Sequence, residues 1–139
     1  MRHYEPIERS AAAIAVTVAV VALVAAVAVT VRGHDKVWAH AAATTGGDPQ
    51  RGQAMFIQYG CGSCHHLTYV RKATGEVGPP LDGIAVRAVI AGKLSNTPEN
   101  LQRWIEDPQA ATPGTAMPDL HVSDRDARDI TAFLYTRSS

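Results

Sequence analysis

The sequence predicts an all-α protein, with one membrane-spanning helix followed by a small domain of three main helices joined by loops. Three observations carry this prediction. One long stretch near the amino terminus contains no charged residue, and three later segments combine helix-capping residues with apolar positions at helical spacing. No stretch alternates apolar and polar residues well enough to predict a strand. A chain of 139 residues leaves room for a single compact domain besides the apolar stretch.

The uncharged stretch SAAAIAVTVAVVALVAAVAVTV runs from Ser10 to Val31 and predicts a transmembrane anchor over residues 11–31, after a cytoplasmic segment 1–10. A helix needs about 20 apolar residues to cross the hydrocarbon core of a bilayer. The alternative is a cleavable signal peptide, since Ala39-His40-Ala41 resembles a cleavage site, but the apolar core of such a peptide is usually only about 7–15 residues long. A helix that is apolar all round is poorly suited to a soluble core. We therefore expect a retained anchor in the lipid bilayer.

The charge balance excludes one class of partner. Lysine plus arginine and aspartate plus glutamate both number 13, and no basic run stands out. A nucleic-acid-binding protein would need a basic face, so no nucleic-acid partner is expected. Residues 32–50 are rich in Ala, Thr, Gly and Asp and include the breaker cluster GGDP, which predicts a linker. The compact domain then covers residues 51–139.

The three helices of this domain are predicted from their caps and apolar spacing. Their expected spans are residues 49–59, residues 98–106 and a segment that begins at residue 124. Asp48, Thr97 and Ser123 precede them, and side-chain oxygens of this kind cap helix amino termini. So few helices, joined by long loops, bury little apolar surface, and small domains of this kind usually need a metal, disulfides or a cofactor.

Residues 61–65 read CGSCH and contain both cysteines of the chain. A structural zinc site needs four protein ligands, and the other histidines show no paired spacing. A thioredoxin-like dithiol would open a helix in a βαβ unit, whereas this pair follows a helix and no parallel-sheet pattern is present. The third use of two cysteines at this spacing is haem attachment: in the motif C-x-x-C-H, the two thiols attach a haem covalently and the histidine that follows binds its iron. We therefore expect one haem c, attached through Cys61 and Cys64, with His65 as an iron ligand.

A second iron ligand is predicted in PGTAMP, residues 113–118. Methionine sulfur is a soft ligand suited to haem iron, and histidine–methionine ligation raises the reduction potential. A lone methionine is more often core filler. Met117 differs because Pro113, Gly114 and Pro118 give its loop an irregular shape that filler would not need.

These motifs, in this order, resemble the class I single-haem cytochrome c family over nearly all of residues 51–139. In that family a glycine and an aromatic residue precede the attachment motif, as Gly52 and Phe56 do here. A Gly-Pro-x-Leu segment follows, here GPPL, and LQRWIEDPQAATPGTAM is similar to the second half of the family pattern. The resemblance implies the small cytochrome c fold, in which helices and loops surround one covalently bound haem.

The resemblance also implies roles for individual residues. The Pro79 carbonyl would accept the outer ring proton of His65, and Leu81 would pack on the haem face. Arg87 and Thr115 would contact the propionates, and Trp104 would lie beside the methionine ligand. The remaining residues expected around the haem are Leu120, Ile130 and Leu134. Phe133 would cross the first helix near Gly52.

With both axial positions filled by protein, the expected activity is single-electron transfer and not catalysis. We expect a membrane-anchored carrier between a quinol-oxidising complex, such as quinol–cytochrome c reductase, and a terminal oxidase or reductase. Bacterial haem attachment takes place outside the cytoplasmic membrane, which predicts a single-pass inner-membrane protein with a periplasmic haem domain. Two alternatives remain: a fixed haem subunit of a larger complex such as a cytochrome oxidase or nitric oxide reductase, and a haem peroxidase or sensor.

Overall fold

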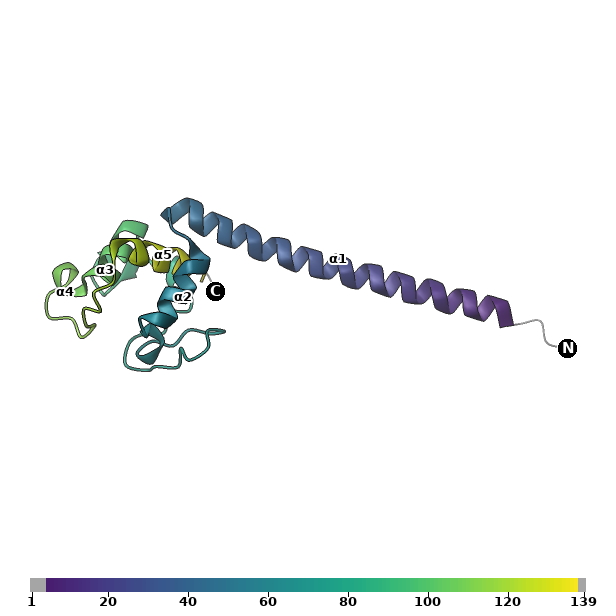
Figure 1. The fold of residues 1–139 in the computed structure, drawn as a ribbon, viewed down its shortest axis with the longest axis horizontal. Coiled ribbons are helices and arrows are strands. Elements are labelled where there is room, and N and C mark those ends of the chain that lie inside the picture. The colour runs from purple at the N-terminus through teal and green to yellow at the C-terminus, as the bar shows by residue number, and fades with distance from the viewer. Residues whose placement is uncertain (1–4, 138–139) are drawn as a thin grey trace. The chain divides into compact units, whose positions relative to one another are not determined.

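The computed structural model describes residues 5–137, most of which are helical (Figure 1). The chain divides into two compact units between Lys36 and Val37. The long helix α1, Glu5–Thr45, extends over both units. Its residues up to Lys36 lie in the first unit, and its last turns, from Val37 onward, lie in the second. The second unit contains the remaining helices and the candidate site. The predicted all-α fold is therefore confirmed.

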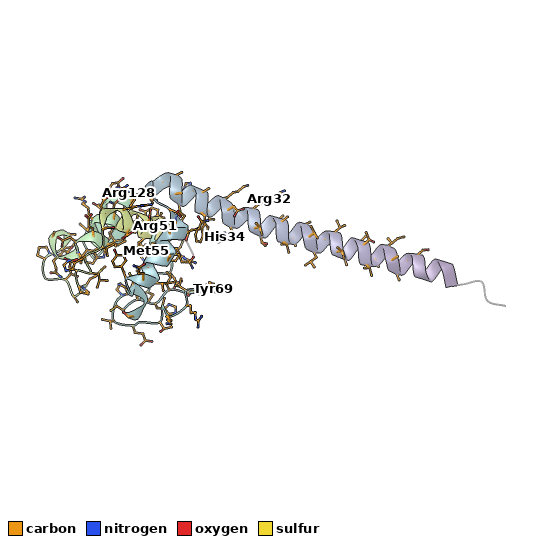
Figure 2. All side chains as sticks on the ribbon, in the orientation of Figure 1. Arg32, His34, Arg51, Met55, Tyr69 and Arg128 are labelled. Atoms are coloured by element: carbon orange, nitrogen blue, oxygen red, sulfur yellow. The ribbon has the colours of Figure 1, made fainter. Side chains whose placement is uncertain are left out.

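Between residues 10 and 31 every side chain of α1 is apolar or small and uncharged, and side chains project from both edges of this stretch in Figure 2. The large apolar residues between Ile14 and Val31 are 52–68% exposed. Within the described residues, one helical stretch, Ser10–Thr45, is long and apolar enough to cross a membrane. By length and composition this stretch agrees with the predicted anchor.

The predicted linker differs from the structure. Instead of a tether up to residue 50, the helix continues to Thr45 and ends at Gly46, whose φ of 71° gives the left-handed conformation common after a helix. The compact unit begins at Val37 and not at residue 51. Trp38 packs on Phe133 with ring centroids 6.4 Å apart, and Ala41 is fully buried. The last turns of α1 are therefore part of the domain core.

Helices α2, Pro49–Gln58, and α5, Asp124–Tyr135, cross at close range. A Cβ on Gly52 would lie 1.8 Å from the carbonyl oxygen of Asp129, so only glycine permits this approach. The predicted crossing is correct, although the nearest residue to Gly52 is Asp129 and not Phe133. Phe133 instead packs on Phe56, with ring centroids 5.7 Å apart.

Short elements connect these helices. Helix α3, Pro98–Glu106, is followed by α4, Pro108–Ala111, inside a segment expected to be a plain loop. The prediction of no strand is wrong for four residues, because β1, Val89–Ile90, pairs with β2, Leu94–Ser95, as an antiparallel hairpin. Two 3-10 turns, Cys61–Ser63 and Ile84–Val86, complete the described part of the chain.

The predicted helix starts are confirmed because the capping side chains make their hydrogen bonds. Asp48 accepts from the backbone amides of Gln50 and Arg51, at 2.9 and 3.1 Å. Thr97 caps α3, Ser123 caps α5, and a proline stands at the first position of α2 and α3. These short-range contacts fix where each helix begins and hence which face meets the core.

Candidate functional site

A cavity of ≈ 460 Å³ lies between the loops and the helices α3 and α5. Its size falls within the range of ligand and cofactor pockets, roughly 300–1,000 Å³. Most of its walls are apolar. All nine predicted site residues line it: Cys61, Cys64, His65, Pro79, Leu81, Arg87, Trp104, Thr115 and Met117. The structure thus brings together residues that are more than fifty positions apart in the sequence.

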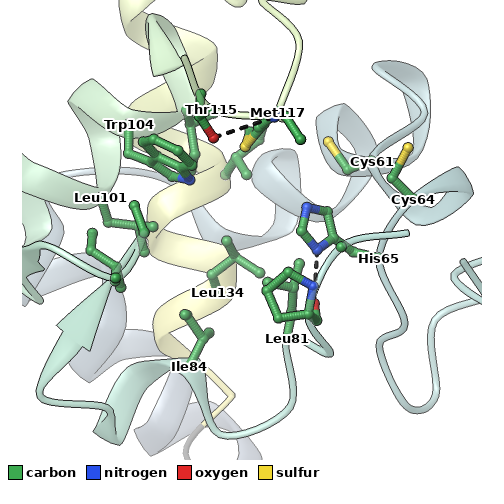
Figure 3. A pocket seen from close by; sticks show the side chains of 18 of the residues that line it. Cys61, Cys64, His65, Leu81, Ile84, Leu101, Trp104, Thr115, Met117 and Leu134 are labelled. Atoms are coloured by element: carbon green, nitrogen blue, oxygen red, sulfur yellow. Dashed lines mark hydrogen bonds between the residues drawn. The ribbon is translucent and has the colours of Figure 1, made fainter. Parts of the chain in front are cut away.

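The CGSCH segment forms one wall of the cavity (Figure 3). The 3-10 turn Cys61–Ser63 is closed by bonds from the amides of Cys64 and His65 to the Cys61 carbonyl, at 3.3 and 3.0 Å. This tight turn presents both sulfurs and the imidazole to the same space. The two cysteines are not joined in a disulfide.

Burial raises the pKa of the Cys61 thiol to about 11. An attacking redox thiolate requires the opposite shift, toward a lowered pKa. The dithiol alternative is therefore not supported by this environment, whereas attachment of an apolar cofactor agrees with a buried thiol.

The imidazole of His65 is held from two sides. Its Nδ1–H donates to the Pro79 carbonyl oxygen at 2.8 Å, which is the hydrogen bond that the resemblance implies. Because Nδ1 carries the proton in this bond, Nε2 is left as the lone-pair nitrogen suited to a metal. A Cβ on Gly78 would lie 2.3 Å from Cε1 of the ring, so the backbone at Gly78 packs directly on the imidazole.

Met117 enters the cavity from the loop that follows α4 (Figure 3). Its backbone amide donates to the Thr115 hydroxyl oxygen at 3.4 Å. The Thr115 hydroxyl accepts in this contact, so its own proton can still be donated to a ligand in the cavity. The structure therefore places an imidazole and a thioether at one cavity, from two separate segments.

The remaining predicted residues form the walls and the rim. Leu81 is buried and Trp104 is half-buried on α3. The Arg87 Nη2 donates to the carbonyl oxygens of Pro80 and Asp82, and these contacts hold its guanidinium at the rim. One expectation is wrong: Leu120 is 37% exposed and does not line the cavity, because the chain after Pro118 leaves it.

Several apolar wall residues were not predicted as site residues: Phe56, Ile84, Ile90, Leu101 and Ile105. A signal existed for the last two. They share the apolar face of α3 with Trp104 at helical spacing, so a haem contact at Trp104 predicts contacts at both. For Ile84 and Ile90, which come from a 3-10 turn and a two-residue strand, no periodic pattern was available.

The donor set fits a haem better than a metal ion bound by protein alone. Among residues 5–137, no group of three or more histidine, cysteine, aspartate or glutamate side chains could hold a metal ion. One imidazole, one thioether, two thiols and an apolar wall instead suit an iron that brings its own macrocycle. Ile130 and Leu134 of α5 line the cavity as expected.

Comparison with known proteins gives the same result. The family model described as Cytochrome c matches residues 49–138. Over 85 residues the chain is 35% identical to cytochrome c oxidase subunit 2 of Alkalihalophilus pseudofirmus, covering 60% of this chain and 24% of that protein. Over 89 residues it is 32% identical to cytochrome c oxidase subunit 2 of a Bacillus species, covering 61% and 25% respectively.

A third relative covers more of its own length. The chain is 27% identical over 130 residues to cytochrome c2 of Rhodomicrobium vannielii, which covers 81% of this chain and 96% of the relative. The chain thus spans about a quarter of the two oxidase subunits but nearly all of the cytochrome c2. No solved structure matches it at a comparable level of significance.

Proposed function

The chain belongs to the cytochrome c family of haem electron carriers, and we propose that it is a membrane-anchored carrier whose haem iron is held between His65 and Met117. The family carries a covalently bound haem c, for which Cys61 and Cys64 are the only cysteines in the sequence. The observation that carries the proposal is that both cysteines, the imidazole and the thioether line one apolar cavity.

The chain's own residues prepare the site for electron transfer. When bound, the haem supplies a one-electron Fe(III)/Fe(II) couple. The Pro79 carbonyl keeps the His65 proton on Nδ1, so Nε2 is left with a lone pair for the iron, and the backbone of Gly78 packs on the ring. The mostly apolar walls limit access of water, and ligation by the Met117 thioether together with His65 would raise the reduction potential. If His65 and Met117 both bind the iron, it would have no position left for a substrate.

We further propose that α1 anchors the carrier in the bacterial cytoplasmic membrane, with the haem domain on the periplasmic side. The support is the apolar stretch of α1 and the attachment of bacterial haem c outside that membrane. Anchoring confines the domain near membrane-bound redox enzymes and raises its effective concentration there. Such a carrier would take electrons from a quinol-oxidising complex and pass them to a terminal oxidase or reductase.

A fixed subunit of a terminal oxidase is the second candidate. It is favoured by the two relatives named cytochrome c oxidase subunit 2, which match this chain over a quarter of their length. A peroxidase or sensor would instead need a free iron position, which requires Met117 to leave.

Exposed cations mark a candidate docking surface. Arg71 and Lys72 are exposed beside Tyr69, which is 95% exposed at the tip of its loop (Figure 2). Lys93 is exposed in the β1–β2 turn, whose neighbours Ala91 and Gly92 line the cavity. We propose that these cations meet an acidic surface of the redox partner, which would make the association sensitive to salt.

The decisive experiment measures electron transfer and association together. Membranes that contain the chain are solubilised in mild detergent, and the chain is purified. A free carrier is expected to separate from the oxidase and to restore quinol-dependent oxidase turnover when it is added back. A stable, stoichiometric complex with the oxidase would favour the fixed subunit. Peroxide consumption by the purified protein, with no restored turnover, would reject both.

Reversal of surface charge tests the docking surface. The double charge reversal Arg71→Glu/Lys72→Glu is expected to lower oxidase turnover at low salt and to have little effect at high salt. Arg125→Glu on α5 changes the charge of an exposed residue that does not line the cavity and serves as the control. Equal turnover of both variants at low salt would reject this surface.

A further inference from the structure

The loop that carries Met117 has little packing of its own. Pro113, Gly114 and Ala116 are exposed, and Met117 is only half-buried. Gly114 has a φ of 81°, a conformation that favours glycine. Inside the loop, the Thr115 amide donates to the Thr112 carbonyl at 3.2 Å, and the Met117 amide makes the long contact to the Thr115 hydroxyl. Exposed segments with few apolar contacts open at low free-energy cost. A stable closed loop therefore depends on contacts with residues outside it.

One side chain supplies these contacts. The Gln109 amide nitrogen donates to the backbone carbonyl oxygens of Thr115 and Met117, at 3.0 and 3.1 Å. Its amide oxygen accepts from the Gly114 amide at 3.3 Å. Both ends of the amide are therefore used, and the pattern fits only one orientation of the group, since carbonyls accept and an N–H donates. Three backbone groups of the loop meet at this single side chain.

Gln109 is itself well placed for this role. It lies in α4, whose first turn is fixed by the buried Pro108 and by the Asp107 carboxylate, which accepts from the Ala110 amide at 2.8 Å. Helix α4 directly follows α3, which forms a wall of the cavity. The amide therefore ties the methionine loop to a capped helical turn next to the site.

We propose that Gln109 is a positioning residue that holds the Met117 loop in the geometry in which the methionine sulfur ligates the iron. This inference rests on the proposed ligation by Met117. Gln109 does not line the cavity and acts only through the loop backbone. Without it, the loop opens more often, the thioether leaves the iron more often, and external ligands enter faster.

The test compares two glutamine-to-leucine variants of the full-length holo-protein in mild detergent. Gln109→Leu removes the hydrogen bonds to the loop. Gln102→Leu is the control, because the Gln102 amide nitrogen also donates, but to the Asp124 carboxylate at 2.8 Å and not to the loop. The readouts are the rate at which imidazole displaces methionine from ferric iron and the intensity of the far-red band that methionine coordination produces. Gln109→Leu is expected to raise the displacement rate at least about tenfold, because all three hydrogen bonds between Gln109 and the loop are lost.

A second variant distinguishes the loss of hydrogen bonds to the loop from a general effect of substituting an exposed residue. Gln109→Glu has the same shape and keeps an acceptor, but at neutral pH it lacks both donors and sets a carboxylate against two carbonyl oxygens. We expect it to displace methionine at least as fast as Gln109→Leu does. If only solvation at this position mattered, glutamate would behave like the wild type, and that result would overturn the inference.

The outcomes separate this inference from the proposed function. A wild-type protein without the far-red band would overturn ligation by Met117 and, with it, the role of Gln109. A wild-type band together with equal displacement rates in the wild type, Gln109→Leu and Gln102→Leu would overturn the role of Gln109 alone. A faster rate in Gln109→Leu, with unchanged thermal unfolding, is the expected result.

Discussion

The two segments that carry the candidate iron ligands are built in opposite ways. His65 follows a tight 3-10 turn, donates to Pro79 and is packed against the backbone of Gly78. Met117 lies in an exposed loop whose carbonyls are held by Gln109. The histidine side is thus fixed by many short-range contacts, and the methionine side by few.

The difference predicts which ligand is permanent and which is exchangeable. On the histidine side, His65 directly follows the turn that carries the cysteines and its amide donates to the Cys61 carbonyl, so displacing the imidazole means breaking its bond to Pro79 and disturbing that turn. On the methionine side, the loop can open once a few hydrogen bonds, mainly those to Gln109, are broken. Changes on the histidine side should therefore reduce folding of the holo-protein, whereas changes on the methionine side should alter the spectrum and the potential first.

The largest effect is expected from loss of the attachment residues. The double variant Cys61→Ala/Cys64→Ala should yield little folded protein, because the small domain then loses the covalent cofactor that fills its cavity. The measurement is the amount of protease-resistant protein in membranes, detected by a method that does not depend on haem, with the haem content of the same fraction measured separately. Normal yields with tightly bound haem would show that the cysteines are dispensable for folding.

The next effect is expected at Gly78. In Gly78→Ala the new methyl group would lie 2.3 Å from Cε1 of His65, so the ring or the loop must shift. A forced fit of this kind typically costs about 1–3 kcal/mol of unfolding free energy. Guanidinium unfolding of the holo-protein measures it. Gly33→Ala is the control, because nothing lies within 4 Å of a Cβ at that position. Equal unfolding free energies would mean that Gly78 does not fix the ring.

The smallest effect is expected at the contact between α2 and α5. Its polar residues do not line the cavity and affect His65 only indirectly, by stabilising the packing of the two helices. Asp126 accepts from Arg51 and from the Tyr59 hydroxyl at 2.8 Å. Hydrogen bonds from Ser123, Tyr59 and Arg51 lower the pKa of Asp126. Because the folded pKa is below the unfolded value of about 3.9, this stabilisation is complete above that pH and is lost as the pH falls through the folded pKa.

Asp126→Asn should therefore lower the Tm by a few degrees near neutral pH. The difference from the wild type should begin to shrink below about pH 4, as the unfolded chain takes up its proton, and should vanish only once the pH falls through the lowered pKa of the folded Asp126 carboxylate. Thermal unfolding followed at several pH values measures this. A constant difference at all pH values would show that the charge of Asp126 is not the cause. The far-red band should be the same in both proteins.

Much of the fold was predictable because its signals are short-range. Asp48, Thr97 and Ser123 mark the starts of three helices, and each makes the expected cap. The cavity was predictable in outline because CGSCH and PGTAMP carry its chemistry in the sequence itself. Helix α4 was missed although Asp107 and Pro108 provide the same cap-and-proline signal as α2 and α3.

Other features depend on packing that the sequence does not express locally. Residues 37–45 contain no sustained apolar period, yet Trp38 packs on Phe133 and Ala41, one turn further along the helix, is buried. Leu120 was expected in the site because of its position after Met117, but the direction of the chain there is set by loop geometry. The contacts of Gln109 also depend on the folded loop and have no sequence pattern.

If Met117 is the second iron ligand, its removal must change the visible spectrum in a defined way. The oxidised and reduced visible spectra of membranes that contain the wild type are compared with those of Met117→Ala. Ligation by Met117 predicts a sharp α-band in both reduced proteins and a far-red band in the oxidised wild type. The variant should lose the far-red band and have a lower reduction potential. A wild type without that band, or a variant that keeps it, would show that Met117 does not ligate the iron.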